Sequence, residues 1–502
     1  MLARIRSVTL HGVEAIPLTV EVDISPGLPS IHTVGLPDAA IRESADRVRA
    51  ALRNAGFKLP PRRITISLAP AEIRKQGAGL DLPIALAILA AHGALPAGRL
   101  DRLLVVGELA LDGAVRRVRG GLPAALMARR DGLEAMILPA DNSAEALAIP
   151  GPGVHPVRSL SEAIDILRRD RPPDRAGATP FAPAPAAEGS DLSEVCGQAH
   201  ARRALEVAAA GGHHLLMVGP PGCGKTMLAR RLPGILPPLD LEEAIEVTCV
   251  YSAAGLLETP GLVRSRPFRA PHHTLSGVGL VGGGRGPQPG EVTLAHRGVL
   301  FLDELAEFGR ATLDVLRQPL EEGMVVIRRA ASATRMPARF TLVAAMNPCP
   351  CGQLGRADRP CGCTPAVVAL YRARVSGPLL DRFEMQLELS PVPLEALRKR
   401  DCGESSATVA ARVAAARLRR NAGNADRAPE GRRHADRPDE AGSRLLALAM
   451  NRFALSARAH DAILRVARTI ACLDGAERIA AGHVAEAIQY RALDRARTRD
   501  PC

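Results

Sequence analysis

The stretch Gly219-Pro-Pro-Gly-Cys-Gly-Lys-Thr226 decides the fold of the central part of this chain. It fits the pattern G-x-x-x-x-G-K-[ST], in which glycines allow backbone N–H groups to turn toward phosphate oxygens. An apolar run at Leu215–Val218 precedes it and a helical run at residues 227–232 follows it, which is the context that the pattern requires. The stretch therefore predicts a nucleoside triphosphate site in an α/β domain, with Lys225 on the β- and γ-phosphates and the Thr226 hydroxyl on Mg²⁺.

We expect the whole loop to bind ATP, with Mg²⁺ as the second cofactor. The loop residues are Gly219, Pro220, Pro221, Gly222, Cys223, Gly224, Lys225 and Thr226.

Polar side chains follow two further apolar runs. The run at residues 298–302 ends in Asp303 and Glu304. A carboxylate at such a strand end can hold Mg²⁺ through water, which we assign to Asp303, and a second can polarise the attacking water, which we assign to Glu304. The run at residues 340–346 ends in Asn347, whose amide can orient the water and sense the γ-phosphate. The alternative for Asn347 is a turn-forming role before a proline.

Two changes of composition divide the 502 residues. The first, at residues 171–190, is rich in Pro and Ala, has no apolar periodicity and is typical of an extended linker. A second segment, residues 398–443, is dominated by Asp, Arg, Gly and Ala. We therefore predict an α/β domain at residues 1–170, the linker at 171–190, an α/β ATPase domain at 191–395 and a helical domain at 396–502.

Periodicity predicts individual elements within these regions. In the first domain, strands at 18–24, 63–68 and 103–106 alternate with helices at 38–55, 82–91 and 122–130. In the last, a helix over 406–420 places Val409, Val413 and Ala416 on one face, an exposed loop spans 421–442, and helices over 445–499 break at 473–475 and 480–482.

The net charge of +12 suits a polyanionic partner. The absence of Trp, with only three Tyr and eight Phe, counts against single-strand recognition by aromatic stacking. The longest apolar run, residues 82–95, contains Pro83, His92 and Gly93 and is too short to cross a bilayer. The first residues lack the apolar core of a signal peptide. We therefore expect a cytoplasmic protein with reduced thiols and no membrane partner.

The order of these motifs resembles that of an AAA+ ATPase. More narrowly, residues 191–350 resemble the Mg-chelatase-like AAA+ ATPases of the YifB/ComM type. The stretches that carry the resemblance are Cys196-Gly-Gln, Arg266-Pro-Phe-Arg-Ala-Pro-His-His-Thr274, Gly282-Gly-Gly, Pro289-Gly-Glu-Val-Thr-Leu-Ala-His296 and Asn347-Pro-Cys-Pro-Cys-Gly352.

The resemblance implies a ring-forming ATPase, a hexamer that drives branch migration of recombining DNA during natural transformation. It implies that Arg382, after Leu379-Leu-Asp, is an arginine finger for a neighbouring subunit's ATP, and that Arg458 is a second sensor on the helical lid. The segment at residues 264–297 looks like the insertion that related motors point toward the ring pore. His272 and His273 within it are either metal ligands or structural contact residues.

The first domain is similar to the protease domain of Lon, which has a ribosomal S5 domain 2-like α/β fold. The stretches in Lon's order are Lys75-Gln-Gly-Ala-Gly, Val106-Gly-Glu-Leu-Ala-Leu-Asp-Gly113, Arg119-Gly-Gly-Leu122 and Leu138-Pro-Ala-Asp-Asn142. Lon's chemistry needs a serine nucleophile and a lysine base. Those positions hold Gly79 and Ala125, so we expect a non-catalytic binding module, in which Lys75 is not a base.

Four of the ten cysteines lie close together in the sequence: Cys349, Cys351, Cys361 and Cys363. Four thiolates on one loop could close a tetrahedral zinc site, although C-x-x-C is the commoner spacing. The alternative is a reduced, proline-constrained loop near the Asn347 strand.

Two functions remain in competition. One is an ATP-driven motor, a DNA helicase or branch-migration factor on branched or single-stranded DNA. The other is a chelatase-type ATPase that remodels a protein partner. A peptidase is disfavoured because Gly79 and Ala125 replace the reacting groups.

Overall fold

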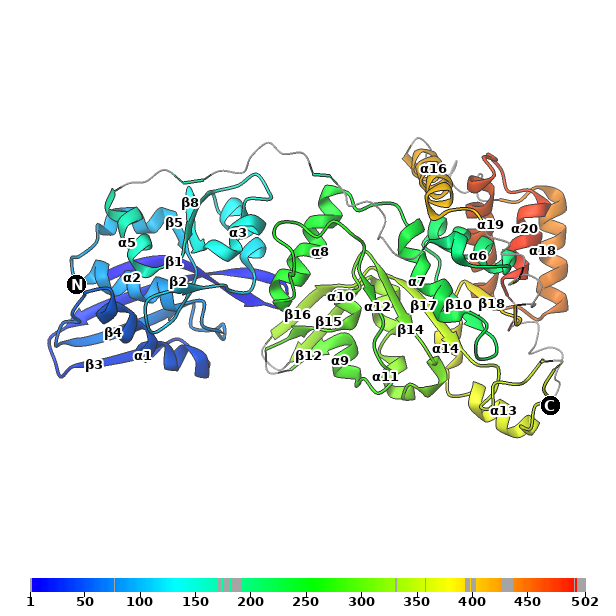
Figure 1. The fold of residues 1–502 in the computed structure, drawn as a ribbon, viewed down its shortest axis with the longest axis horizontal. Helices are drawn as coiled ribbons and strands as arrows, with labels where there is room; N and C mark the ends of the chain where they lie inside the picture. The colour runs from blue at the N-terminus through cyan, green and yellow to red at the C-terminus, as the bar shows by residue number, and fades with distance from the viewer. Residues whose placement is uncertain are drawn as a thin grey trace.

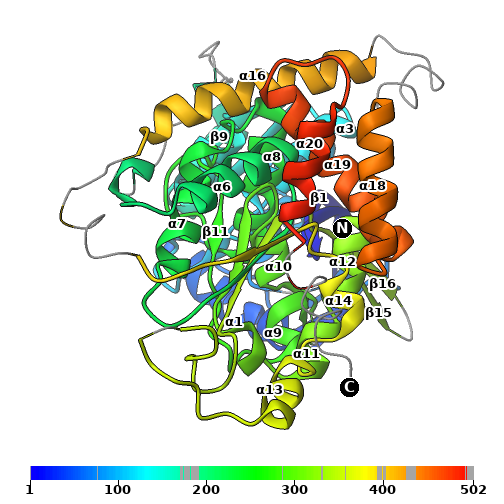
Figure 2. The same cartoon turned by 90° about the vertical axis from the view of Figure 1, so that its right-hand side faces the viewer.

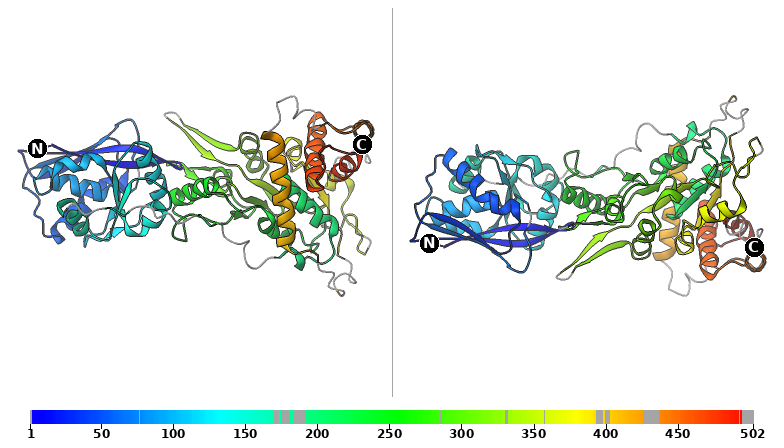
Figure 3. Two further views of the ribbon diagram at one scale, coloured as in Figure 1. Left: turned by 90° about the horizontal axis from the view of Figure 1, so that it is seen from above. Right: turned by 90° about the horizontal axis from the view of Figure 1, so that it is seen from below.

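The computed structural model describes residues 2–75, 77–169, 173–174, 181–182, 191–284, 286–329, 332–356, 358–392, 398, 403–425, 437–491 and 493. Three regions follow one another along the long axis of the molecule (Figure 1), and the same order is clear from above and below (Figure 3). The predicted linker at 171–190 lies outside the described residues, except for 173–174 and 181–182. Within the described residues, no helix has the length and apolar character that crossing a membrane requires.

The amino-terminal region is a seven-stranded sheet in the order β3-β4-β2-β1-β5-β8-β9. Its predicted strands and helices are confirmed to within a few residues. The strands are β1 (Leu2–His11), β2 (Glu14–Ser25), β3 (Ser30–Val34), β4 (Arg63–Ala69), β5 (Leu103–Val105), β8 (Ala135–Pro139) and β9 (Gly153–Val157), with a small pair β6 (Glu108–Leu109) and β7 (Val115–Arg116). The helices are α1 (Ala39–Asn54), α2 (Asp81–Ala91), α3 (Gly121–Arg130), α4 (Ser143–Ala146) and α5 (Leu160–Arg169).

The long apolar run of the sequence forms α2, and every residue of that helix is buried. A helix that is apolar all round belongs in a core. Its first residue, Asp81, is fully buried and accepts hydrogen bonds from Ser44 and from the guanidinium of Arg47 (2.7 Å to Nε), so the buried charge is paired. The run is therefore explained by packing inside the first domain.

The central region is a parallel sheet in the order β11-β14-β17-β10-β18. Its strands are β10 (Leu215–Val218), β11 (Phe268–Arg269), β14 (Val299–Leu302), β17 (Thr341–Met346) and β18 (Met385–Glu388), with two hairpins, β12 (Gly282–Gly283) with β13 (Gln288–Pro289) and β15 (Met324–Arg329) with β16 (Ser332–Pro337). Its helices are α6 (Ala199–Gly211), α7 (Lys225–Ile235), α8 (Leu241–Ala254), α9 (Gly277–Val281), α10 (Glu291–Leu294), α11 (Arg310–Asp314), α12 (Arg317–Glu322), α13 (Pro365–Arg372) and α14 (Gly377–Leu380).

Both faces of the central sheet are covered, which is why its strands are apolar throughout. Along β10, Leu215 and Met217 belong to the core on one face and Leu216 and Val218 to the core on the other. Side chains alternate between the faces of a strand, so a strand between two cores has no polar face. The predicted apolar strands, now β10, β14 and β17, therefore form the centre of the sheet.

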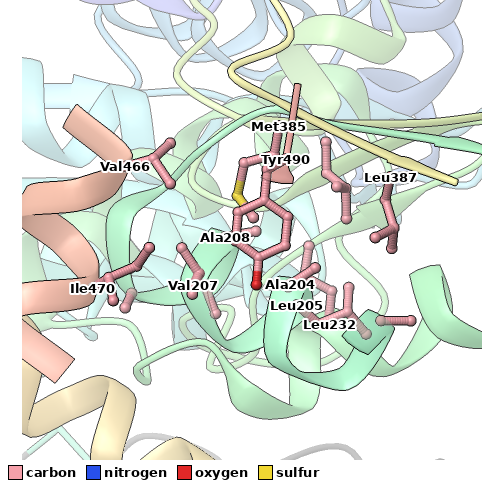
Figure 4. Close-up of a cluster of buried hydrophobic side chains, with 14 of the residues drawn as sticks. Ala204, Leu205, Val207, Ala208, Leu232, Met385, Leu387, Val466, Ile470 and Tyr490 are labelled. Carbon is pink, nitrogen blue, oxygen red and sulfur yellow. The ribbon is translucent and has the colours of Figure 1, made fainter. Parts of the chain in front are cut away.

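The carboxyl-terminal region is helical and shares a core with the central sheet. It contains α16 (Ser406–Ala425), α18 (Glu440–Arg452), α19 (Ala457–Leu473) and α20 (Ala481–Gln489), with α16 lying across one end of the central region (Figure 2). Tyr490 is fully buried among side chains from α6, α19 and β18 (Figure 4), and its hydroxyl donates to Glu486 (3.0 Å). The helical region therefore packs directly against the central sheet.

The predicted helix break at 473–475 is confirmed by the end of α19 at Leu473, whereas the predicted break at 480–482 is wrong for its last two residues, because α20 already begins at Ala481. Val409, Val413 and Ala416 are buried on one face of α16, as predicted. The predicted loop at 421–442 is too long at both ends. Residues 421–425 continue α16, and α18 begins at Glu440 with Asp439 as its N-cap. The cap accepts from the backbone N–H of Gly442, a start signal that the polar composition of the segment obscured. Residues 426–436 lie outside the described residues.

The amino-terminal region is packed on the central region through α8. Val247 of α8 and Leu122 of α3 are both fully buried in one apolar cluster, and the backbone N–H of Gly120 donates to the carbonyl of Ser252 (3.0 Å). At the tip of β1, the imidazole of His11 is 2.7 Å from the hydroxyl of Thr334 on the β15–β16 hairpin. Hydrophobic burial and hydrogen bonds thus join the two regions directly.

A carboxylate at the amino-terminal edge of the central sheet joins that sheet to α19. Glu384 accepts a hydrogen bond from the backbone N–H of His214 (3.1 Å) and lies 3.4 Å from His213 Nδ1 and 3.2 Å from Arg465. Burial by itself would raise the pKa of Glu384, but the hydrogen bond from His213 and the positive charges around it lower the pKa to about 2. The ionised form of Glu384 therefore stabilises the fold.

A Glu384→Gln variant should be less stable at neutral pH by about 3 kcal/mol. A carboxyl whose pKa falls from its ordinary value of 4.5 to about 2 on folding stabilises the protein above its unfolded pKa. That contribution is lost as the pH falls through about 4.5 toward 2. The difference between the thermal midpoints of parent and variant should therefore shrink with acidification. A pH-independent difference would contradict the assignment, and the exposed Glu388→Gln is the matched control.

Candidate ATP site

The predicted phosphate loop joins the carboxyl end of β10 to the start of α7. Gly222 and Gly224 have φ angles of +78° and +92°, a left-handed conformation that glycine adopts without strain. A Cβ on either of them would meet no heavy atom of the described residues within 4 Å, so this side of the loop is open. The loop therefore combines exposed backbone N–H groups with a helix N-terminus, which together favour a bound anion.

The structure brings Lys225 and Asn347 together. The ammonium of Lys225 donates to the carbonyls of Gly219 (2.7 Å) and Pro220 (3.0 Å) and to the Oδ1 of Asn347 (3.2 Å). Asn347 follows β17, which pairs with β10 in parallel register, so both side chains stand at the same edge of the sheet. Burial lowers the pKa of Lys225. A phosphate could replace these carbonyl partners and pair the charge directly.

The two residues predicted to hold Mg²⁺ also meet. The hydroxyl of Thr226 donates to Asp303 Oδ2 at 2.7 Å, and Asp303 follows β14 at the same sheet edge. A hydroxyl and a carboxylate are oxygen ligands, and Mg²⁺ typically takes few protein ligands beside phosphates and waters. The side chains present therefore fit the ion that the family resemblance implies.

Glu304 is held in an unusual backbone conformation next to Asp303. Its φ of +51° is left-handed, which costs a residue with a side chain more than glycine. Its carboxylate is 57 % exposed and lies 3.5 Å from Nδ1 of His273, whose ring packs on that of His272 (4.1 Å between centroids). The sequence spacing showed no carboxylate near these histidines. The contact forms because β11 pairs in parallel with β14, so the residues that follow these two strands lie at the same end of the sheet.

Arg382 lies at the opposite edge of the sheet from the phosphate loop. Met385 pairs with Leu215, the first residue of β10, so Arg382 precedes the amino end of β18. The phosphate loop begins after the other end of β10, and four strand residues span about 13 Å. Arg382 pairs with Glu321 of its own chain. The structure thus separates Arg382 from the phosphate loop of its own chain.

Arg458, the predicted second sensor, lies beside Arg382 instead of beside Lys225. Its guanidinium is 3.7 Å from Asp381, the residue before Arg382. Burial and the charges of Arg458, Arg317 and Arg465 lower the pKa of Arg382. Arg382 and Arg458 therefore form one basic cluster at the amino-terminal edge of the sheet, and the role of Arg458 stays a prediction.

In the amino-terminal region, Gly79 and its neighbours line a cavity of about 450 Å³, and Ala125 is buried inside α3. The ammonium of Lys75 donates to the carbonyl of Pro70, and burial lowers the pKa of Lys75. Arg119 and Gln288 also line the cavity, so it lies where the first region meets the segment at 264–297. The resemblance to Lon remains a prediction.

A phosphate loop, an Asp-Glu strand end and an Asn strand end on adjacent parallel strands, followed by a helical region, define an ATPase of the AAA+ class. Three family models match this chain in order. "Subunit ChlI of Mg-chelatase" matches residues 20–142, "Magnesium chelatase, subunit ChlI" matches 191–397, and "Magnesium chelatase, subunit ChlI C-terminal" matches 403–491. The chain belongs to the Mg-chelatase-like AAA+ proteins of the YifB/ComM type.

Individual relatives agree with that assignment. The chain is 46 % identical over 498 residues to the uncharacterized protein YifB of Escherichia coli, with 96 % of each chain covered. It is 43 % identical over 503 residues to the competence protein ComM of Haemophilus influenzae, with 98 % of each chain covered. It is 27 % identical over 174 residues to the magnesium-chelatase 38 kDa subunit of Cereibacter sphaeroides, which covers 31 % of this chain and 52 % of that subunit.

A Lys225→Ala variant should fold but lose ATP binding, because Lys225 is the one lysine of the phosphate loop and its ammonium would pair with the phosphates. A ligand at 100 times its Kd stabilises a protein by about 2.7 kcal/mol. Mg-ATP should therefore raise the thermal midpoint of the parent and leave that of the variant unchanged. Arg230→Ala on the exposed face of α7 is the matched control and should keep the full shift. A full shift in the Lys225 variant would refute the assignment.

Proposed function

We propose that this protein is an ATP-hydrolysing ring motor, working with ATP and Mg²⁺, that acts as a DNA helicase or branch-migration factor in homologous recombination during natural transformation. The subunits form a ring, taken as a hexamer from the resemblance, and the substrate is branched or single-stranded DNA. The place of Arg382 carries the proposal, because a finger that cannot reach its own phosphate loop needs a second subunit.

The geometry supports a separate role in ATP hydrolysis for each residue of the candidate site. The loop's N–H groups and Lys225 would bind and orient the phosphates, while Thr226 and Asp303 would hold Mg²⁺, which neutralises phosphate charge. Glu304 would leave His273 and accept a proton from the water that attacks the γ-phosphorus. The bond to the bridging oxygen then breaks to give ADP and phosphate. Asn347, already paired with Lys225, would report the loss of the γ-phosphate.

The net charge of the chain and the name of one relative support DNA as the substrate. The chain carries +12, and the β15–β16 hairpin presents exposed Arg328 and Arg335 beyond the sheet. One relative is named a competence protein. Duplex DNA carries closely spaced phosphates with condensed counterions. A basic surface that binds these phosphates releases the counterions, which favours binding.

DNA binding should weaken steeply with salt. For about four phosphate contacts, affinity should fall by about 100-fold between 50 and 200 mM salt. Fluorescence anisotropy with forked, Holliday-type and single-stranded DNA measures this, and ATPase and strand-displacement assays on the same substrates test the motor. DNA binding that does not change with salt, or a rate of ATP hydrolysis that none of the three DNAs changes, would argue against the proposal.

The second candidate is an ATPase that remodels a protein partner. The match to models of a magnesium chelatase subunit favours it. Stimulation of ATP hydrolysis by a protein partner in the absence of DNA would support this function in place of the DNA motor.

A further inference from the structure

The four clustered cysteines come together at one point of the loop between β17 and α13. Their sulfur atoms all lie within 4.8 Å of one another. The Sγ–Sγ distances are 3.4 Å for Cys349–Cys351, 3.7 Å for Cys349–Cys361 and 3.6 Å for Cys351–Cys361. A disulfide would place two sulfurs about 2.05 Å apart, so these contacts are between separate thiols.

The sulfur spacing matches a single tetrahedral ion. Zinc–sulfur bonds of about 2.3 Å at tetrahedral angles place the sulfurs about 3.8 Å apart. Four uncharged thiols have little reason to gather at one point of a polar loop, whereas four thiolates around a dication are stable there. The geometry points to a structural zinc site formed by Cys349, Cys351, Cys361 and Cys363.

Backbone groups already face the sulfur atoms as they do around metal thiolates. The N–H of Leu354 donates to Cys349 Sγ, and the N–H of Cys363 donates to Cys361 Sγ, both at 3.4 Å. Such N–H···S contacts orient the ligands and stabilise their negative charge. Because all four positions are protein thiols, the site has no open coordination position and is structural, not catalytic.

The position of the site defines its role. Cys349 is two residues after Asn347, and a Cβ on Gly352 would lie 2.6 Å from Pro221 of the phosphate loop. Immediately after Cys363, Thr364 caps α13, accepting from the N–H of Val367. Zinc would therefore hold the loop against the phosphate loop and fix the start of the helix that leads toward Arg382.

Metal analysis of the full-length protein, purified under reducing conditions without added metal, tests this inference. We expect one zinc ion per chain. A Cys351→Ser/Cys363→Ser variant should lose it, while Cys196→Ser should keep it, because Cys196 lies outside the cluster. Cys351 is exposed, so its loss leaves no cavity in the core. Cys351→His should retain zinc, since three cysteines and one histidine are a common structural set.

Cobalt(II) provides an independent readout. Replacing zinc by cobalt in the parent should produce the absorption of a tetrahedral tetrathiolate centre, and Cys351→His should shift it. Circular dichroism separates loss of the metal from loss of the fold. Failure of the folded parent to bind zinc on reconstitution, unchanged zinc in the double serine variant, or stoichiometric iron in the isolated protein would each overturn the assignment.

Discussion

ATP hydrolysis should fall by about 10²–10⁴-fold in a Glu304→Gln variant, the range that a positioned general base supplies. Glutamine keeps the size of the side chain but cannot accept the proton of the attacking water. ATP binding should persist, because Lys225, Thr226 and Asp303 are unchanged. Steady-state ATPase assays measure the first effect, and the nucleotide-induced rise in thermal midpoint measures the second.

The matched control is Glu307→Gln. Glu307 lies three residues further on and pairs with Arg374 on the surface (3.0 Å), so its removal should leave the rate within about two-fold because exposed pairs contribute little. A Glu304→Gln enzyme that hydrolyses ATP at the parental rate would refute the general-base assignment. Loss of both binding and hydrolysis would instead indicate that Glu304 supports the loop.

An Arg382→Ala variant should lose about 10³–10⁵ in the rate of ATP hydrolysis, or about 4–7 kcal/mol of barrier. A guanidinium from outside the site stabilises the charge that spreads over the transferred phosphoryl oxygens. The Nε of Arg382 is buried and has no hydrogen-bond partner among the described residues, so it retains a donor for a further group. Single-turnover hydrolysis in assembled rings measures the loss.

Mixing experiments decide whether Arg382 acts on a neighbouring subunit. Arg382→Ala and Lys225→Ala should each be nearly inactive alone. In mixed rings, some interfaces join an intact finger to an intact phosphate loop, and part of the activity should return. Glu321→Gln removes the partner of Arg382 within its own chain and should leave hydrolysis intact. No recovery in rings shown to be mixed, or a fully active Arg382→Ala protein, would rule out this role.

Local features of the candidate ATP site were predictable from the sequence. The strand–loop–helix around Lys225 depends on four apolar residues, a loop with three glycines and a helix start that are contiguous in the chain. Asp303 and Asn347 could be placed because parallel strands with two buried faces are uniformly apolar and end where polar residues begin. The same reasoning misjudged the ends of α16 and α18, where a polar composition concealed helix and cap.

Contacts between distant segments were decided by the tertiary structure. The sequence by itself determined the phosphate loop, the strand ends and the apolar helices, because periodicity and backbone preferences act over a few residues. The contacts of His273 with Glu304, of Arg382 with Glu321 and of α8 with α3 depend on how whole elements pack, and no local pattern encodes that relation. The four cysteines combine a sequence signal with a tertiary one. Their spacing in the sequence did not decide whether they bind zinc, and only the folded loop brought their sulfur atoms within 4.8 Å of one another.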